Sequence, residues 1–242
     1  MIKRALAIGA IAAATIAMPA AASAQQIQPG ESITMDGSFC TLNWIYDGAG
    51  PLAGNVYAGT AAHCVSGVGQ EVSLATGSLG EPIERIGEVA FVGDADEPGR
   101  DYAFIRVDAE DLSQVNPALK GHPNIPTGVS TGYARGDVMQ FSGYGIVFHL
   151  AGATREQRIG VLNATDGVEH DILGAVTPGD SGGPVADVTD GNTAFGIVNT
   201  VGAGVNTGAL TVVTAGEGGA NLDFVLQDAA NRGFPVTLRT IG

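Results

Sequence analysis

The chain has 242 residues, of which 25 are acidic and 11 are Lys or Arg, so its formal net charge at pH 7 is −14. Such an acidic chain repels phosphate backbones and anionic lipids, which argues against nucleic-acid and membrane-surface partners. Glycine accounts for 37 residues, about twice its usual share. Short runs rich in Val, Ile and Thr alternate with Gly, Asn, Asp and Pro, and this pattern predicts an all-β protein.

Residues 1–24 have the features of a secretory signal peptide. Two basic residues precede an apolar run at 5–17, and Ala22-Ser23-Ala24 forms a small-x-small cleavage site before Gln25. The apolar run is too short and too rich in alanine for a stable membrane anchor. We therefore expect a secreted, extracellular protein that begins near Gln25.

The expected strands form two groups, separated by a proline-rich connector at 109–128. The first group lies at residues 38–45, 55–60, 71–75, 84–92 and 102–107. The second group lies at residues 138–142, 159–163, 171–173, 184–187, 194–201 and 209–213. This spacing suits two six-stranded antiparallel barrels. We expect one domain over 25–242, with an N-terminal barrel at about 32–126 and a C-terminal barrel at about 127–242.

One helix is predicted close to the end of the chain. Asn221 is a suitable N-cap, Gly233 follows the last turn, and one face carries the apolar residues Leu222, Val225, Leu226 and Ala229. A short strand at 235–238 is expected after this helix. The C-terminal helix is therefore expected to be short and amphipathic and to pack its apolar face on the β domain.

The chain has two cysteines, Cys40 and Cys64. In an exported protein a pair of cysteines normally forms a disulfide. Closing this loop would constrain the unfolded chain by about 3 kcal/mol in the chain-entropy model. The bridge would also tie the segment that carries His63 to a neighbouring strand.

Ser181 lies in the small-residue stretch Gly179-Asp180-Ser181-Gly182-Gly183. A serine in such a turn can present its hydroxyl at an open surface, and neighbouring backbone N–H groups can point at a developing oxyanion. Serine is a weak nucleophile until a base activates it. His63 is the candidate base and Asp101 the candidate acid, so the chain order is His, Asp, Ser.

Two other serine-hydrolase folds are disfavoured. The Gly-x-Ser-x-Gly pattern at 179–183 also fits the nucleophile elbow of α/β-hydrolases, but that fold needs a histidine after the serine and none follows Ser181. A subtilisin order would need an aspartate before His63, which Asp36 or Asp47 could supply. The subtilisin fold would also need helices that alternate with parallel strands, and the sequence shows almost no such alternation.

The three motifs together resemble the chymotrypsin-like serine proteases, in particular the small secreted bacterial members of the streptogrisin type. The family resemblance rests on residues 60–64, 101–107 and 177–184. Residues 37–42 and 101–103, Pro178 and the helix and strand at the end indicate the bacterial branch, and the resemblance covers about 36–238. It implies a catalytic cleft between two barrels. It implies no metal or organic cofactor. The expected partners are polypeptide substrates, and the protein is expected to be a monomer.

The resemblance implies a role for each motif residue. Ser181 would attack the scissile carbonyl, His63 would take and return the proton, and Asp101 would orient the imidazole. The amides of Gly179 and Ser181 would form the oxyanion hole, and Asp180 would be a buried carboxylate that supports the loop. Activity should then rise with pH near the ordinary imidazole pKa of about 6.5.

The resemblance also implies a substrate pocket formed by Ala175, Asn199, Thr200 and Val201. Ala175 stands where a carboxylate would select Lys or Arg, so a trypsin-like preference is disfavoured. Val201 stands where many members of the family have glycine, and it would narrow the pocket. We therefore expect cleavage after small or medium apolar residues.

The partner of Asp180 is left open by the sequence. No Ile-Val-Gly-Gly segment lies between Gln25 and the first cysteine, so a new N-terminal amine cannot fill that role as it does in animal members. An internal arginine could fill it, and the candidates are Arg135, Arg155 and Arg158.

The alternative to a secreted serine endopeptidase is a catalytically silent homologue that binds a partner through the same cleft. Silent homologues usually lose a motif residue, and here every one is present.

Overall fold

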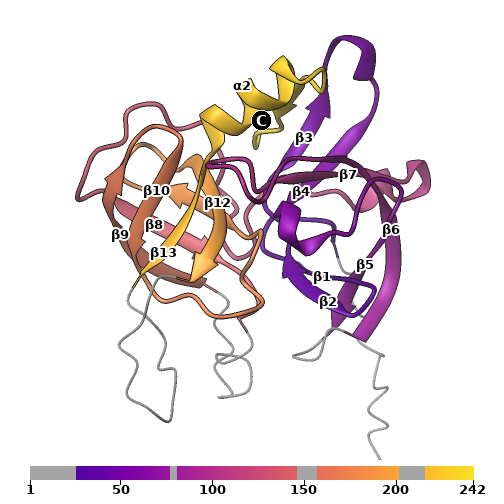
Figure 1. Cartoon of the computed structure of the whole chain (residues 1–242), viewed down its shortest axis with the longest axis horizontal. Coiled ribbons are helices and arrows are strands. Elements are labelled where there is room, and N and C mark those ends of the chain that lie inside the picture. The colour runs from indigo at the N-terminus through magenta and orange to yellow at the C-terminus, as the bar shows by residue number, and fades with distance from the viewer. Residues whose placement is uncertain (1–25, 77–80, 146–156, 202–215) are drawn as a thin grey trace, which may run out of the picture.

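The computed structural model describes residues 26–76, 81–145, 157–201 and 216–242, which form two β units side by side (Figure 1). The expected signal peptide at 1–24 and the expected strand at 209–213 lie outside the described residues. Within the described residues, no helix combines the length and apolar character needed to cross a membrane. Both units are antiparallel, and the described residues contain one short α-helix, close to the C-terminus, so the all-β prediction is confirmed.

The first unit is an eight-stranded sheet in the order β14-β3-β4-β7-β6-β5-β1-β2. Its strands are β1 (Ser32–Met35), β2 (Ser38–Thr41), β3 (Ile45–Gly48), β4 (Val56–Thr60), β5 (Glu71–Thr76), β6 (Glu81–Val92), β7 (Ala103–Val107) and β14 (Val236–Leu238). Three 3-10 helices lie in its connections: η1 (Gly50–Leu52), η2 (Ala62–Cys64) and η3 (Ala109–Gln114). Branched apolar side chains of alternate strand residues, such as Ile33, Val72 and Ile105, form its buried core.

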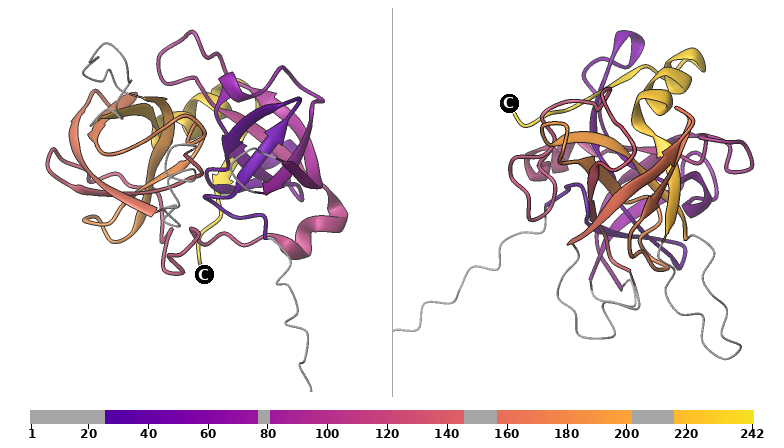
Figure 2. Two further views of the ribbon diagram at one scale, coloured as in Figure 1. Left: turned by 90° about the horizontal axis from the view of Figure 1, so that it is seen from below. Right: turned by 90° about the vertical axis from the view of Figure 1, so that its left-hand side faces the viewer.

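The second unit is a closed barrel in the order β10-β13-β12-β11-β8-β9. Its strands are β8 (Val138–Ser142), β9 (Gln157–Thr165), β10 (Glu169–Leu173), β11 (Pro184–Asp187), β12 (Thr193–Val201) and β13 (Glu217–Asn221). The view from below in Figure 2 shows the barrel beside the first sheet. Phe141, Leu162 and Phe195 are among the buried side chains that fill it.

A shared apolar cluster joins the two units. It contains Trp44 and Phe104 of the first unit, Ile197 of the second, and Val225 and Ala229 of the helix α2 (Leu222–Asn231). Figure 1 shows α2 beside both units. Because these fully buried groups pack in one cluster, the two units have a fixed relative position, and residues of both can build a single site between them.

Several details of the fold differ from the sequence prediction. The first unit has eight strands where six were expected and five were located: β1 was not predicted, and β14, the strand expected at 235–238, returns from the C-terminus to pair with β3. The expected strand at 38–45 is divided in two, with Asn43 at the break, where its Oδ1 accepts a hydrogen bond from the Trp44 amide (2.7 Å). Asn221 precedes α2 as expected, but its side chain makes no helix cap and bonds to His170 instead.

Candidate active site

His63 and Asp101 lie close together because His63 follows β4, Asp101 precedes β7, and these two strands are paired. β4 ends at Thr60, which lies opposite Ala103 at the start of β7, so the residues just outside these ends lie close together. Asp101 Oδ2 is 2.7 Å from His63 Nδ1, and its Oδ1 accepts a hydrogen bond from the His63 amide (2.9 Å). Both carboxylate oxygens are therefore engaged by the same residue, which fixes the imidazole and leaves its Nε2 for other chemistry.

The hydrogen bond to Asp101 also changes the acid-base behaviour of His63. It raises the pKa of the imidazole above the ordinary value of 6.5, partial burial opposes this, and the charge of the carboxylate adds to the increase. The side chain of His63 remains 38 % exposed, so the ring is partly open to solvent. The imidazole of His63 is thus more basic than that of a free histidine.

Ser181 lies in a loop that is attached to the first unit. Its carbonyl accepts a hydrogen bond from the Thr41 amide (2.9 Å) and lies 3.9 Å from Cys64 Sγ. The following Gly182 has a φ of +83°, and a Cβ there would lie 2.3 Å from Thr60 Oγ1, so only glycine fits. Ser181 is half-buried, and no hydrogen bond joins its hydroxyl to His63 within the described residues.

The amides expected to form an oxyanion hole are available. Within the described residues, neither the Gly179 N–H nor the Ser181 N–H donates to a protein acceptor, whereas the Asp180 amide between them bonds to the Thr177 carbonyl (3.0 Å). Gly179 has a φ of +103°, and its Cβ would meet the Tyr144 carbonyl at 2.6 Å. Two unpaired donors on either side of one residue can stabilise negative charge on a single oxygen atom.

The structure identifies the arginine partner of Asp180. Arg158 Nη2 is 2.5 Å from Asp180 Oδ1, with the two side chains 10 % and 2 % exposed. The other carboxylate oxygen accepts from the Thr177 amide (2.8 Å). Burial raises the pKa of Asp180, and the positive charge of Arg158 opposes that change. Arg135 bonds instead to an asparagine on the surface, and Arg155 lies outside the described residues.

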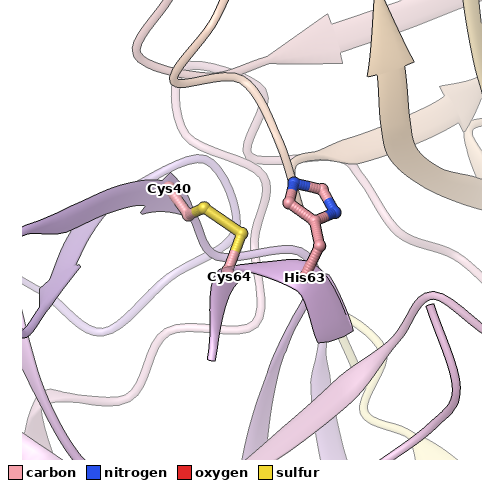
Figure 3. A group of neighbouring side chains, drawn as sticks. All are labelled: Cys40, His63 and Cys64. Atoms are coloured by element: carbon pink, nitrogen blue, oxygen red, sulfur yellow. A yellow bond between two sulfur atoms is a disulfide. The ribbon is translucent and has the colours of Figure 1, made fainter. Parts of the chain in front are cut away.

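The two cysteines form the expected disulfide between β2 and η2, closing a sequence separation of 24 residues. Donor atoms of Cys40, His63 and Cys64 lie within 4.8 Å of one another (Figure 3), and the described residues contain no other such group of possible metal ligands. A disulfide sulfur is not the thiolate that metal ions bind. The cluster is therefore a covalent support for the histidine segment, without metal-binding capacity while the bridge is intact.

The residues expected to line a substrate pocket have different environments. Ala175 is half-buried between β10 and the serine loop. Asn199 donates its amide group to the Asp101 carbonyl and accepts from the Ala220 amide (2.8 Å). Thr200 is exposed and helps to line a cavity of about 300 Å³ next to Asp101. Val201 pairs with Glu217 in the barrel, and its side chain is not among those described.

A buried contact between a histidine and a glutamate inside the second barrel was not predicted from the sequence. His170 Nε2 lies 3.2 Å from Glu217 Oε1, and both side chains are fully buried. His170 Nδ1 is 2.9 Å from Asn221 Oδ1. Burial raises the pKa of Glu217, and the neighbouring histidine opposes this. Gly219 gives the ring its space, because a Cβ at that position would lie 2.8 Å from His170 Nε2.

Comparison with solved structures identifies the fold. A protease from Nocardiopsis is 21 % identical, with a TM-score of 0.59, over 88 % of this chain and 99 % of its own. Protease A from Thermobifida fusca is 19 % identical, with a TM-score of 0.56, over 88 % and 98 %. Chymotrypsin from Cellulomonas bogoriensis is 20 % identical, with a TM-score of 0.56, over 88 % and 98 %.

No protein-family model and no curated protein matches the chain. At this level of identity the likeness to solved structures establishes the fold, and it covers most of the chain and nearly all of each neighbour. The chain therefore has the two-unit fold of the bacterial chymotrypsin-like serine proteases, which confirms that part of the sequence prediction.

Proposed function

We propose that the protein is a serine endopeptidase that uses Ser181, His63 and Asp101 as its catalytic triad. The observation that carries this proposal is the contact between His63 and Asp101, whose Nδ1 and Oδ2 atoms are 2.7 Å apart. Cys64, next to His63, is held by the disulfide to Cys40, and its Sγ lies 3.9 Å from the Ser181 carbonyl oxygen. A base held by a carboxylate beside a serine with free neighbouring amides suits acyl transfer.

The proposed mechanism begins with the neutral imidazole of His63. Its Nε2 takes the proton of Ser181 as the hydroxyl oxygen attacks the scissile carbonyl, and Asp101 stabilises the imidazolium that forms. The amides of Gly179 and Ser181 donate to the tetrahedral oxyanion. His63 then gives the proton to the departing amine as the peptide C–N bond breaks. Water next attacks the acyl group and gives a proton to His63, and His63 returns a proton to the Ser181 oxygen as the ester bond breaks.

The proposal extends to substrate preference. Ala175 would leave the floor of the pocket without a charge, and Val201 would reduce its width, so we propose cleavage after small or medium apolar residues. Lys or Arg at that position would have no carboxylate contact from these two residues, and a cation in an apolar pocket is costly without a partner.

The proposal also covers export and organisation. The features of residues 1–24 support cleavage near Ala24 and release of residues 25–242 as a secreted protein. The two barrel regions expected at about 32–126 and 127–242 would act as one domain, since the proposed triad needs residues from both. The Cys40–Cys64 bridge suits an oxidising extracellular compartment.

A panel of chromogenic peptides tests this function. The peptides differ only in the residue before the cleaved bond, which is Ala, Val, Leu, Phe, Arg or Glu. Mature protein that begins at Gln25 should release chromophore fastest from the small or medium apolar peptides, and Ser181→Ala should lose this turnover. Faster turnover of the Arg peptide would refute the proposed preference. Absence of turnover from every peptide would indicate the silent, partner-binding homologue.

A further inference from the structure

Thr41 holds the serine loop at two points. It is the last residue of β2, follows Cys40 directly and is completely buried. Its hydroxyl donates to the Gly179 carbonyl (2.7 Å), and its amide donates to the Ser181 carbonyl (2.9 Å). One residue of the first unit therefore holds the carbonyl groups of the two residues that carry the candidate oxyanion donors.

The hydroxyl of Thr41 is itself held in one orientation. It accepts a hydrogen bond from the Tyr144 amide (3.3 Å) while it donates to Gly179. The Thr41 carbonyl accepts from Thr60 Oγ1 (3.0 Å), which ties the residue to the end of β4. Because a buried hydroxyl with both a donor and an acceptor has little rotational freedom, its contact with Gly179 has a defined direction.

These contacts act where the backbone is most free to rotate. Gly179 has a φ of +103°, and glycine can turn about φ and ψ at low cost. Peptide groups are planar, so a hydrogen bond to the Gly179 carbonyl fixes the peptide plane between Gly179 and Asp180. This in turn limits rotation of the preceding peptide plane, which carries the Gly179 N–H. The second contact fixes the plane after Ser181, so both donor amides lie within a restrained segment.

We propose that Thr41 is a positioning residue for the oxyanion hole, acting through the Gly179 carbonyl. This inference rests on the proposed serine endopeptidase function. Donors fixed in advance stabilise the oxyanion without reorganising during the reaction, so their benefit arises in the transition state and not in substrate binding. Loss of the Thr41 hydroxyl should therefore lower kcat and leave KM almost unchanged.

The test compares Thr41→Val, which keeps the shape and removes the hydroxyl, with Thr41→Ser, which keeps the hydroxyl. We expect Thr41→Val to lower kcat about tenfold, less than the roughly 100-fold to 1,000-fold cost of deleting a donor, with KM within about twofold. Thr41→Ser should restore kcat. Inhibition by a peptide aldehyde, which forms the oxyanion, should weaken in parallel with kcat/KM, whereas a non-covalent product peptide should bind equally well.

Thr193→Val is the matched control. Thr193 Oγ1 also donates to a backbone carbonyl, that of Asp190 (2.9 Å), but in the turn at the far end of β11 from Ser181. This variant should keep the wild-type kcat. If Thr41→Val does not fold, Thr41→Ala removes the same hydroxyl without adding a methyl group at its position and should show the same loss of kcat.

The outcomes separate the two levels of inference. A folded Thr41→Val or Thr41→Ala variant whose kcat and aldehyde inhibition equal those of the wild type would overturn the positioning role and leave the endopeptidase proposal intact. The positioning role would also be overturned by a change in KM alone. A folded wild-type protein without turnover of any peptide would overturn the proposed function, and the role of Thr41 with it.

Discussion

Replacing Arg158 with leucine should destabilise the protein strongly, because it leaves Asp180 as a buried charge without its partner. The two side chains are 10 % and 2 % exposed and their charged atoms are 2.5 Å apart. Removing one member of a buried pair typically costs about 3–5 kcal/mol. Because 1 kcal/mol shifts Tm by about 2–4 °C in a domain of this size, the expected fall in Tm is roughly 10 °C.

Urea denaturation and thermal melting of mature protein measure this effect, and Arg239→Leu is the matched control. Arg239 also pairs with an aspartate, Asp47, but these side chains are 31 % and 45 % exposed, so the control should lose less than about 1 kcal/mol. The double variant Arg158→Leu with Asp180→Asn should recover more than half of the loss. Equal losses for Arg158→Leu and Arg239→Leu would refute the assignment of Arg158 as the internal partner.

The same variant has an expected pH dependence. Burial raises the pKa of Asp180, and Arg158 is the charge that opposes the increase. Without Arg158 the carboxyl group becomes neutral at a higher pH, and a neutral carboxyl needs no counter-charge. The stability deficit of Arg158→Leu should therefore become smaller as the pH falls towards this raised pKa, and a deficit that grows in acid would contradict the explanation.

Four further predictions concern the histidine segment and the contacts of Asp101. Because Asp101 raises the pKa of His63, kcat/KM should increase through a pKa above 6.5, and Asp101→Asn should lower that midpoint in a pH–rate profile. The same pair stabilises the fold fully below pH 6.5, and this contribution is lost as the pH rises through the higher folded pKa, which pH-dependent melting of wild type and Asp101→Asn would detect. Replacing Cys40 and Cys64 with alanine should cost about 3 kcal/mol for a loop of 24 residues, measured by urea denaturation. Asn199→Ala should lower kcat, because its side chain joins the Asp101 carbonyl to the Ala220 amide, and unchanged kinetics would exclude that role.

Much of the fold could be predicted from local patterns. Alternating apolar residues and glycine-rich turns predicted most strands of both units, since each strand has one face in a core. The strand β13 (Glu217–Asn221) was not predicted, because Glu217-Gly218-Gly219 has low β-propensity. Its glycines are needed instead for space, since a Cβ at Gly219 would lie 1.8 Å from the Ile197 carbonyl. Such a requirement is visible only when the neighbouring strand is in place.

The candidate site was predictable where chemistry imposes a residue type. His63 and Asp101 were chosen from their motifs, and the structure brings them into contact. The choice of Arg158 for Asp180 could not be made, because it depends on which arginine the barrel places beside the serine loop. Glu217 was missed for a different reason: acidic residues are normally exposed, and its burial with a histidine is a tertiary contact without a sequence signature.

Covalent labelling of Ser181 tests the central proposal most directly. Mature protein would be treated with a fluorophosphonate, which phosphonylates an activated serine, and the adduct would be located by peptide mass spectrometry. We predict stoichiometric labelling of Ser181, at a rate that rises with pH through the titration of His63 and is lost in His63→Ala. A folded protein that remains unlabelled, or that is labelled at another serine, would contradict the proposed triad.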